Sequence, residues 1–265
     1  MSGSVERIYA LVMRHIYIWR SSIMRLVDSI YWPAVQMVMW GFMTQYLLPQ
    51  ASFVAQAAGV LLSGLLLWEV VVRGNLSLSI AFLEEMWSRN LGHLFVSPIR
   101  SWEMATGIII AALLRTLLGL IPVSLMAWAF FGYSIYSLGL PLLAFFAILQ
   151  MFSWSIGLAM SGMIMRVGQS AESFAWAAVF ILMPVSGVYY PISVLPHWLQ
   201  VIAYALPTAY VFEGMRAIMA EKIVHWDMLG IAVALSVAYL VVGFQIFQWF
   251  FRQSRRAGTL LGQGE

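Results

Sequence analysis

Six long apolar stretches dominate the chain and contain very few charged residues. Each has about 18 residues or more, the length that a helix needs to cross the hydrocarbon core of a bilayer. Backbone amides find no water in that core, so a spanning segment must bond its own polar groups, as a helix does. We therefore predict an all-α integral membrane protein with six transmembrane helices, at Leu26–Leu48, Phe53–Val72, Met104–Phe131, Leu138–Met165, Ser173–Tyr190 and Met228–Phe251.

Composition excludes several classes of function. Charged residues make up 9% of the chain, against about 25% in soluble domains, so no separate soluble domain is expected. Cysteine is absent and the four histidines lie far apart, which leaves no spacing typical of a metal site. Neither a P-loop nor a His-Glu-x-x-His motif is present. We therefore expect no catalytic residues, no metal, no cofactor in this chain and no nucleic-acid partner.

The placement of basic residues predicts how the spans are oriented. Eleven arginines lie at the N-terminus, after the second and fourth spans, and in the C-terminal tail. The other side has only Arg216 and Lys222. Because Lys and Arg are enriched in cytoplasmic loops, both termini are predicted to be cytoplasmic.

Two cytoplasmic segments have amphipathic patterns. Ile8–Met24 repeats apolar residues at helical spacing among arginines, which predicts a helix in the membrane interface. It is either a simple anchor or a docking surface for a partner. Residues 77–103 alternate charged and apolar side chains up to a break at Ser97-Pro98, so we expect a short helix there. Its apolar face requires a partner surface, either the ends of the spans or another protein.

Few polar residues lie within the spans. Glu69 and Arg73 are four residues apart and are expected to pair at the end of the second span. Arg115 allows two interpretations: a functional charge inside the membrane, or a side chain that snorkels to the inner interface from a long helix. The candidate intramembrane polar residues are Gln36, Gln45 and Arg115.

Residues 192–227 are unusually apolar for a loop between spans. Pro196 and Pro207 leave no room for another full span. Short helices that dip into the outer leaflet satisfy both the length and the composition, because irregular backbone at membrane depth must be buried in protein or line a cavity. We expect this segment to cap or gate a passage, with Glu213 and Arg216 marking its return to water.

Three local patterns together resemble a known family. The first is the N-terminal amphipathic helix. The second is Asn90-Leu-Gly-His-Leu-Phe-Val-Ser-Pro-Ile-Arg-Ser-Trp-Glu103 with Gly107 beyond it, and the third is Tyr190-Pro-Ile-Ser-Val-Leu-Pro-His-Trp-Leu-Gln200 continuing to Arg216. With six spans and both termini inside, the chain resembles the permeases of type-two ATP-binding cassette (ABC) exporters. The resemblance departs at Arg89–Gly92, where many members have Gly-Thr-Leu-Glu; Glu84 and Glu85 are the nearest acidic residues.

The resemblance implies partners and roles. Two permease copies, expected to be a homodimer, would pair in a bacterial inner membrane and dock on two ATP-binding cassette subunits, which hold ATP and Mg. The cargo path would run between the permeases, along the first, second and fifth spans. The coupling residues would be Glu84, Glu85, Trp87, Arg89 and Leu91, and the outer gate would include Pro191, Pro196, Trp198, Pro207, Glu213 and Arg216.

The expected organisation is a single permease domain over residues 1–265. Its parts are an interfacial helix (1–25), spans one and two (26–76), a coupling segment (77–103), spans three to five (104–190), an outer re-entrant segment (191–227), span six (228–251) and a cytoplasmic tail (252–265). The leading hypothesis is an exporter of hydrophobic or amphipathic cargo such as a drug, a lipid or a lipid-linked glycan. An ion-driven carrier or channel using Arg115, and a membrane enzyme using His197 or His225, are the alternatives.

Overall fold

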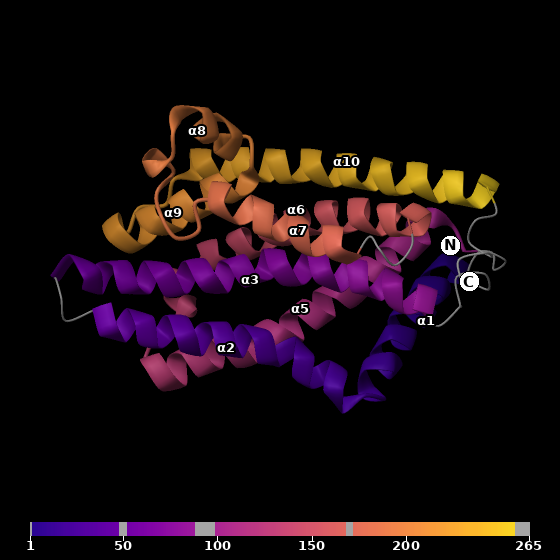
Figure 1. Ribbon diagram of the computed structural model, residues 1–265, viewed down its shortest axis with the longest axis horizontal. Coiled ribbons are helices and arrows are strands. Elements are labelled where there is room, and N and C mark those ends of the chain that lie inside the picture. Colours follow the sequence, from indigo (N-terminus) through magenta and orange to yellow (C-terminus); the bar gives the residue numbers. More distant parts are fainter. Residues whose placement is uncertain (1, 48–51, 88–98, 168–171, 258–265) are drawn as a thin grey trace.

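Long helices packed side by side form the whole of the described protein (Figure 1). The computed structural model describes residues 2–47, 52–87, 99–167 and 172–257, and within these ranges it contains helices and no strands. The principal helices are α1 (Ser2–Arg20), α2 (Ile23–Leu47), α3 (Ser52–Trp87), α5 (Ser101–Phe131), α6 (Leu140–Val167), α7 (Glu172–Leu182), α8 (His197–Tyr204), α9 (Pro207–Glu221) and α10 (Trp226–Ala257).

Among the described residues, four helices are long and apolar enough to cross a membrane. Their apolar windows are Gly59–Glu84, Trp102–Phe131, Leu140–Arg166 and Trp226–Ser254. They correspond to the predicted second, third, fourth and sixth spans. The apolar helix Ser173–Val185, at the predicted fifth span, is shorter, and α2, at the predicted first span, is not among the four. The all-helical fold is therefore confirmed, whereas a total of six spans stays a prediction.

Helix α3 differs most from the sequence-based expectation. The second span was expected to stop at Val72, with a cytoplasmic segment beginning at residue 77. Instead one helix continues through Trp87, since no proline interrupts Ser52–Trp87 and the apolar pattern persists to Leu83. Residues 77–87 therefore continue α3 and do not start a separate helix, and the rest of the expected coupling segment up to residue 98 lies outside the described residues.

The core of the bundle is centred on α6, which packs against both α3 and α10. Large side chains such as Phe145, Leu149 and Phe152 are fully buried there. Small residues let the helix backbones approach: an added Cβ at Gly243 of α10 would lie 2.8 Å from Cα of Ser155 on α6. Such small contact residues are typical of helix packing in membranes, where apolar burial alone does not favour association.

The two ends of the bundle differ. The start of α1 and the end of α10 lie at one end, whereas α8 and α9 lie at the other (Figure 1).

Helix α1 was expected over Ile8–Met24, but it ends at Arg20 and α2 begins at Ile23 after a sharp turn. Leu11 and Trp19 are buried and α1 packs against α5, while Tyr9 and Tyr17 are exposed. At the far end, two short helices, α8 and α9, occupy the expected outer segment.

Candidate functional site

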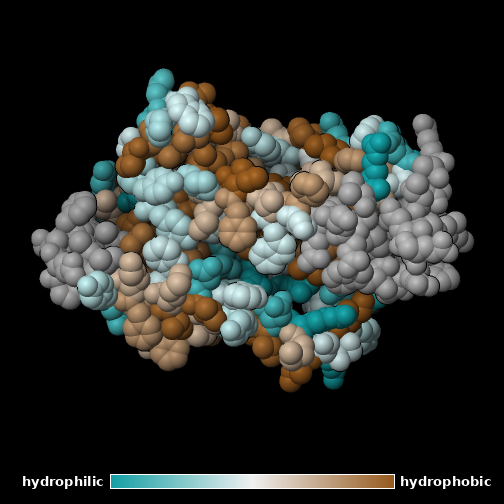
Figure 2. Space-filling view, in the orientation of Figure 1, coloured by the Kyte–Doolittle hydropathy of each residue, from teal (hydrophilic) through white to brown (hydrophobic). Residues whose placement is uncertain are grey.

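A cavity of about 380 Å³ lies between α2, α3, α5 and α7. It is lined by apolar side chains and by four charged ones, Asp28, Glu69, Arg73 and Arg115. Figure 2 shows hydrophilic side chains in a hollow between α2 and the helices above it, with apolar surface around them. Ligand sites are usually concave, mainly apolar and equipped with a few polar groups, so this cavity is the candidate functional site.

Helix α2 contributes one polar and aromatic stripe to the cavity. Asp28, Trp32 and Gln36 all line it, and their four-residue spacing puts them on one face of the helix. The Trp32 side chain is 57% exposed. Asp28 makes no ion pair with any described residue. Gln36 and Gln45 were both predicted as intramembrane polar residues. Gln36 lines the cavity, whereas Gln45 is exposed elsewhere on α2.

The predicted pair of Glu69 and Arg73 forms on α3. Nε of Arg73 lies 3.5 Å from Oε2 of Glu69, and both side chains are largely buried. The pair was expected at the cytoplasmic end of the second span, but it lies near the middle of the apolar window Gly59–Glu84. Charged side chains at such a depth are rare and usually face a cavity or the protein interior. Glu69 and Arg73 both line the cavity, so a ligand in the cavity would contact one charge of each sign.

Arg115 is enclosed by three other helices. Its side chain is 9% exposed, its Nη1 lies 3.9 Å from Oε1 of Glu84, and its guanidinium lies 5.9 Å from the ring centre of Trp19. Arg25 approaches the same Glu84 oxygen at 3.8 Å. The Arg115 side chain is therefore held inside the protein, whereas its depth in the membrane and its functional role stay predictions.

The coupling residues fall at the end of α3 or beyond it. Glu84 is buried between Arg25 and Arg115, so its carboxylate belongs to an internal ion-pair cluster. Glu85 and Trp87 belong to the last turn of α3. Arg89 and Leu91 lie outside the described residues. Their role in docking stays a prediction.

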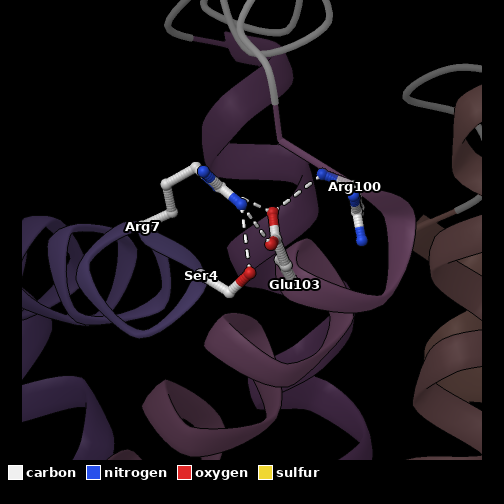
Figure 3. Close-up of polar contacts among 4 residues, drawn as sticks. All are labelled: Ser4, Arg7, Arg100 and Glu103. Atoms are coloured by element: carbon white, nitrogen blue, oxygen red, sulfur yellow. Dashed lines mark hydrogen bonds and ion pairs between the residues drawn. The ribbon is translucent and has the colours of Figure 1, made fainter. Parts of the chain in front are cut away.

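A second cluster of polar contacts joins the start of α5 to α1 (Figure 3). Arg7 donates hydrogen bonds to both oxygens of Glu103, at 2.6 and 2.9 Å, and the backbone amide of Arg100 donates to the same carboxylate at 3.0 Å. Arg7 also donates to Ser4. The Glu103 carboxylate raises the pKa of Arg7 above its ordinary value. These contacts fix the N-terminal helix to the end of the segment expected to contact a partner.

The predicted gate residues Glu213 and Arg216 tie α9 to the chain after α7. Arg216 pairs with Glu213 at 3.0 Å and donates to the carbonyl oxygen of Gly187 at 2.7 Å. Glu213 accepts a hydrogen bond from the amide of Ile192 at 2.8 Å. Gly187 has φ of 68°, a conformation that favours glycine. The two charges therefore fasten the outer segment to the chain after α7, and their position at its return to water stays a prediction.

The remaining gate residues are spread over this segment. Pro191 and Pro196 are exposed, and so is Trp198 at the start of α8. Pro207 is buried at the first position of α9, where its missing amide proton is not needed by the helix.

Sequence reasoning missed the cavity because it treated Arg73 as part of a segment beyond the second span. The structure shows that the same helix continues to Trp87 and that Arg73 and Asp28 line one cavity. The signal was available in the sequence. Residues 52–87 contain no proline, and Asp28, Trp32 and Gln36 repeat at four-residue spacing.

Comparison with known families supports the interpretation of the fold. Residues 7–220, which are most of the chain, match the family model described as ABC-2 type transporter. No curated protein matches the chain.

Proposed function

The chain belongs to the ABC-2 type transporter family and is a multi-pass membrane permease of an ABC transporter; on that premise, we propose that it is the transmembrane subunit of an ATP-driven exporter. Its cargo is hydrophobic or amphipathic, and it moves out of the cytoplasm or the inner leaflet. The observation that carries this proposal is the charged cavity between α2, α3, α5 and α7. A cavity with an ion pair near the centre of a spanning helix suits cargo that has both apolar and polar parts.

The energy source is assigned to a partner. Membership of the family implies association with an ATP-binding cassette subunit, and this chain has no P-loop of its own. We propose two copies of that subunit, holding ATP and Mg, below a homodimer of permeases in a bacterial inner membrane. The start of α1 and the end of α10 lie at the same end of the bundle (Figure 1), which suits the prediction that both termini are cytoplasmic.

The proposed cargo path follows the cavity toward the outer segment. Helices α2, α3 and α7 correspond to the predicted first, second and fifth spans, and all three line the cavity. Tyr189, at the start of the segment that Arg216 fastens, also lines it and stacks on Trp40 of α2 at 4.9 Å between ring centres. Movement of the outer segment would therefore displace Tyr189 and change the lining of the cavity. This supports the role of the outer segment as a gate.

The alternative, an ion-driven carrier or channel that uses Arg115 as an anion site, has weaker support. Arg115 already has Glu84 beside it and stacks near Trp19. A site for a small anion alone would need a net positive charge, whereas the side chains that line this cavity carry two charges of each sign.

Association with the ATP-binding subunit tests the proposed function. The permease is co-expressed with a candidate ATP-binding subunit, and complex yield and ATP hydrolysis are measured. Charge reversal at Arg89 (Arg89→Glu), just after α3, is expected to reduce both, because it changes the predicted docking segment. Glu84 is unsuitable for this test because its buried carboxylate contributes to the fold.

The matched control is Glu221→Lys. Glu221 is exposed at the end of α9, at the opposite end of the bundle. This reversal should leave complex formation and ATP hydrolysis unchanged. Full transport by the purified chain without any ATP-binding subunit would contradict the proposed function.

A further inference from the structure

We propose that the cavity between α2, α3, α5 and α7 binds the headgroup of a zwitterionic amphiphile, whose anionic group meets Arg73 and Arg115 and whose cationic amine meets Asp28 and tryptophan rings. The proposal names the cargo class of the permease and in that respect rests on the proposed function. It depends on four observations: the charge balance of the cavity, its loose ion pairs, its aromatic lining and its shape.

The charges that line the cavity sum to zero. Asp28 and Glu69 are acidic, and Arg73 and Arg115 are basic. Glu84 and Arg25, which flank Arg115, add one charge of each sign. A ligand with a single net charge would leave one charge uncompensated in a region of low dielectric, which is costly. A zwitterion keeps the site neutral while still supplying a partner for each sign.

The ion pairs at the cavity are long compared with those elsewhere in the described protein. Arg73 and Glu69 are 3.5 Å apart, and Arg115 and Glu84 are 3.9 Å apart. In contrast, the Arg7–Glu103 pair is 2.6 Å long. Nη1 of Arg115 is buried and makes no hydrogen bond.

These distances leave donors for a ligand. A guanidinium has five N–H donors and no acceptor, and charge-assisted hydrogen bonds are normally shorter than 3 Å. Arg73 and Arg115 therefore retain donors for the oxygens of a phosphate-like group, which planar guanidinium groups bind well.

The opposite charge of the ligand meets Asp28 and aromatic rings. Asp28 makes no ion pair with any described residue, although its charge lies near enough to act on both Arg73 and Arg115. Trp32, Trp68 and Trp176 line the same cavity from three helices. Aromatic faces attract ammonium groups, and quaternary ammonium ligands are commonly held by several rings together. The carboxylate and the tryptophans thus supply both attractions that a cationic amine requires.

The size and the mouth of the cavity suit a headgroup with an attached tail. Its volume of about 380 Å³ is at the small end of ligand sites, which span roughly 300–1,000 Å³. Trp32 and Phe180, on α2 and α7, are both more than half exposed at its lining. An apolar tail leaving between these helices would lie against aromatic surface while the headgroup stays inside.

Four amphiphiles with the same tail and different headgroups test the proposal. The probes are n-dodecylphosphocholine (zwitterionic), n-dodecyl phosphate (anionic), dodecyltrimethylammonium (cationic) and dodecyl maltoside (uncharged). The full-length permease is purified in dodecyl maltoside. Each charged probe is then titrated in, and binding is followed by native mass spectrometry and by the shift in thermal midpoint.

We expect dodecylphosphocholine to bind at least about tenfold more tightly than either dodecyl phosphate or dodecyltrimethylammonium, since each missing attraction is worth about 1–2 kcal/mol and 1.4 kcal/mol is tenfold. Trp32→Leu should weaken its binding by about tenfold. Trp128→Leu should not, because Trp128 is similarly exposed (63%) but lies outside the cavity. Replacing both members of the ion pair (Glu69→Gln with Arg73→Gln) should also weaken binding without leaving an unpaired charge.

Two results would overturn the proposal: equal binding of dodecyl phosphate and dodecylphosphocholine, or unchanged binding in the Trp32 variant. The assay uses the permease alone, so a failure here is distinguishable from a failure of ATP-driven export, which is measured with the partner subunit. Stimulation of ATP hydrolysis by dodecylphosphocholine would identify the zwitterion as cargo. Binding without stimulation would support the headgroup site but overturn the assignment of the zwitterion as cargo.

Discussion

The contact between α6 and α10 makes a strong prediction about one glycine. A Cβ added at Gly243 would lie 2.8 Å from both Cα and the carbonyl carbon of Ser155. Backbone atoms of α6 cannot rotate away as a side chain would, so Gly243→Ala must push the two helices apart. Overpacking of this kind costs about 1–3 kcal/mol, and we expect a value near 3 because backbone opposes backbone.

Gly230 on the same helix is the matched control. An added Cβ there meets nothing within 4 Å. Alanine is favoured over glycine in a helix by about 1 kcal/mol at either position, so this gain cancels when the two variants are compared. The free energy of unfolding of Gly243→Ala should therefore lie about 3 kcal/mol below that of Gly230→Ala.

Thermal unfolding of the purified variants in detergent measures the difference. At roughly 2–4 °C per kcal/mol for a large chain, the midpoint of Gly243→Ala should fall roughly 6–12 °C below that of Gly230→Ala. Equal midpoints would refute close packing of the α6 and α10 backbones, and with it the central position of α6.

Four further variants test the charged residues and the outer segment. Glu69→Gln leaves Arg73 buried without its partner and should destabilise the protein by about 3–5 kcal/mol, whereas the double change with Arg73→Gln should recover most of that loss; equal unfolding midpoints in the two variants would count against a buried pair. Arg216→Gln removes the contacts to Glu213 and Gly187, so it should lower the free energy of unfolding by about 2–3 kcal/mol and reduce export, and normal stability and flux together would remove the fastening role. Trp198→Ala changes an exposed side chain, so it should leave stability within about 0.5 kcal/mol while reducing export in a vesicle flux assay, and wild-type flux would remove Trp198 from the gate.

Much of the fold was predictable because hydrophobic length is a strong signal in membranes. The spans near Met104–Phe131 and Leu138–Met165 match α5 and α6 within a few residues at their starts and ends. Prolines also indicated correctly that residues 192–227 form short helices. These features depend on local sequence, so no knowledge of tertiary contacts was needed to find them.

The charged residues were harder to place because their surroundings are set by packing. Arg115 was ambiguous until the structure put Glu84 and Trp19 beside it, from segments distant in the sequence. Glu69 and Arg73 were correctly paired, but the sequence did not show that α3 continues to Trp87 and that both side chains line a cavity. A helix tolerates such a pair within the membrane when neighbouring helices enclose it, and a single sequence does not reveal those neighbours.

Labelling of one cavity residue in the assembled transporter measures most directly whether ATP in a partner subunit moves this cavity. The chain has no cysteine, so Gln36→Cys, which lies in the cavity, provides a single thiol. We expect a membrane-impermeant maleimide to label it from the cytoplasmic side without nucleotide, and from the outer side when the complex with the ATP-binding subunit is trapped with ATP and vanadate. The same labelling rate from each side in both states would contradict ATP-driven transport through this cavity.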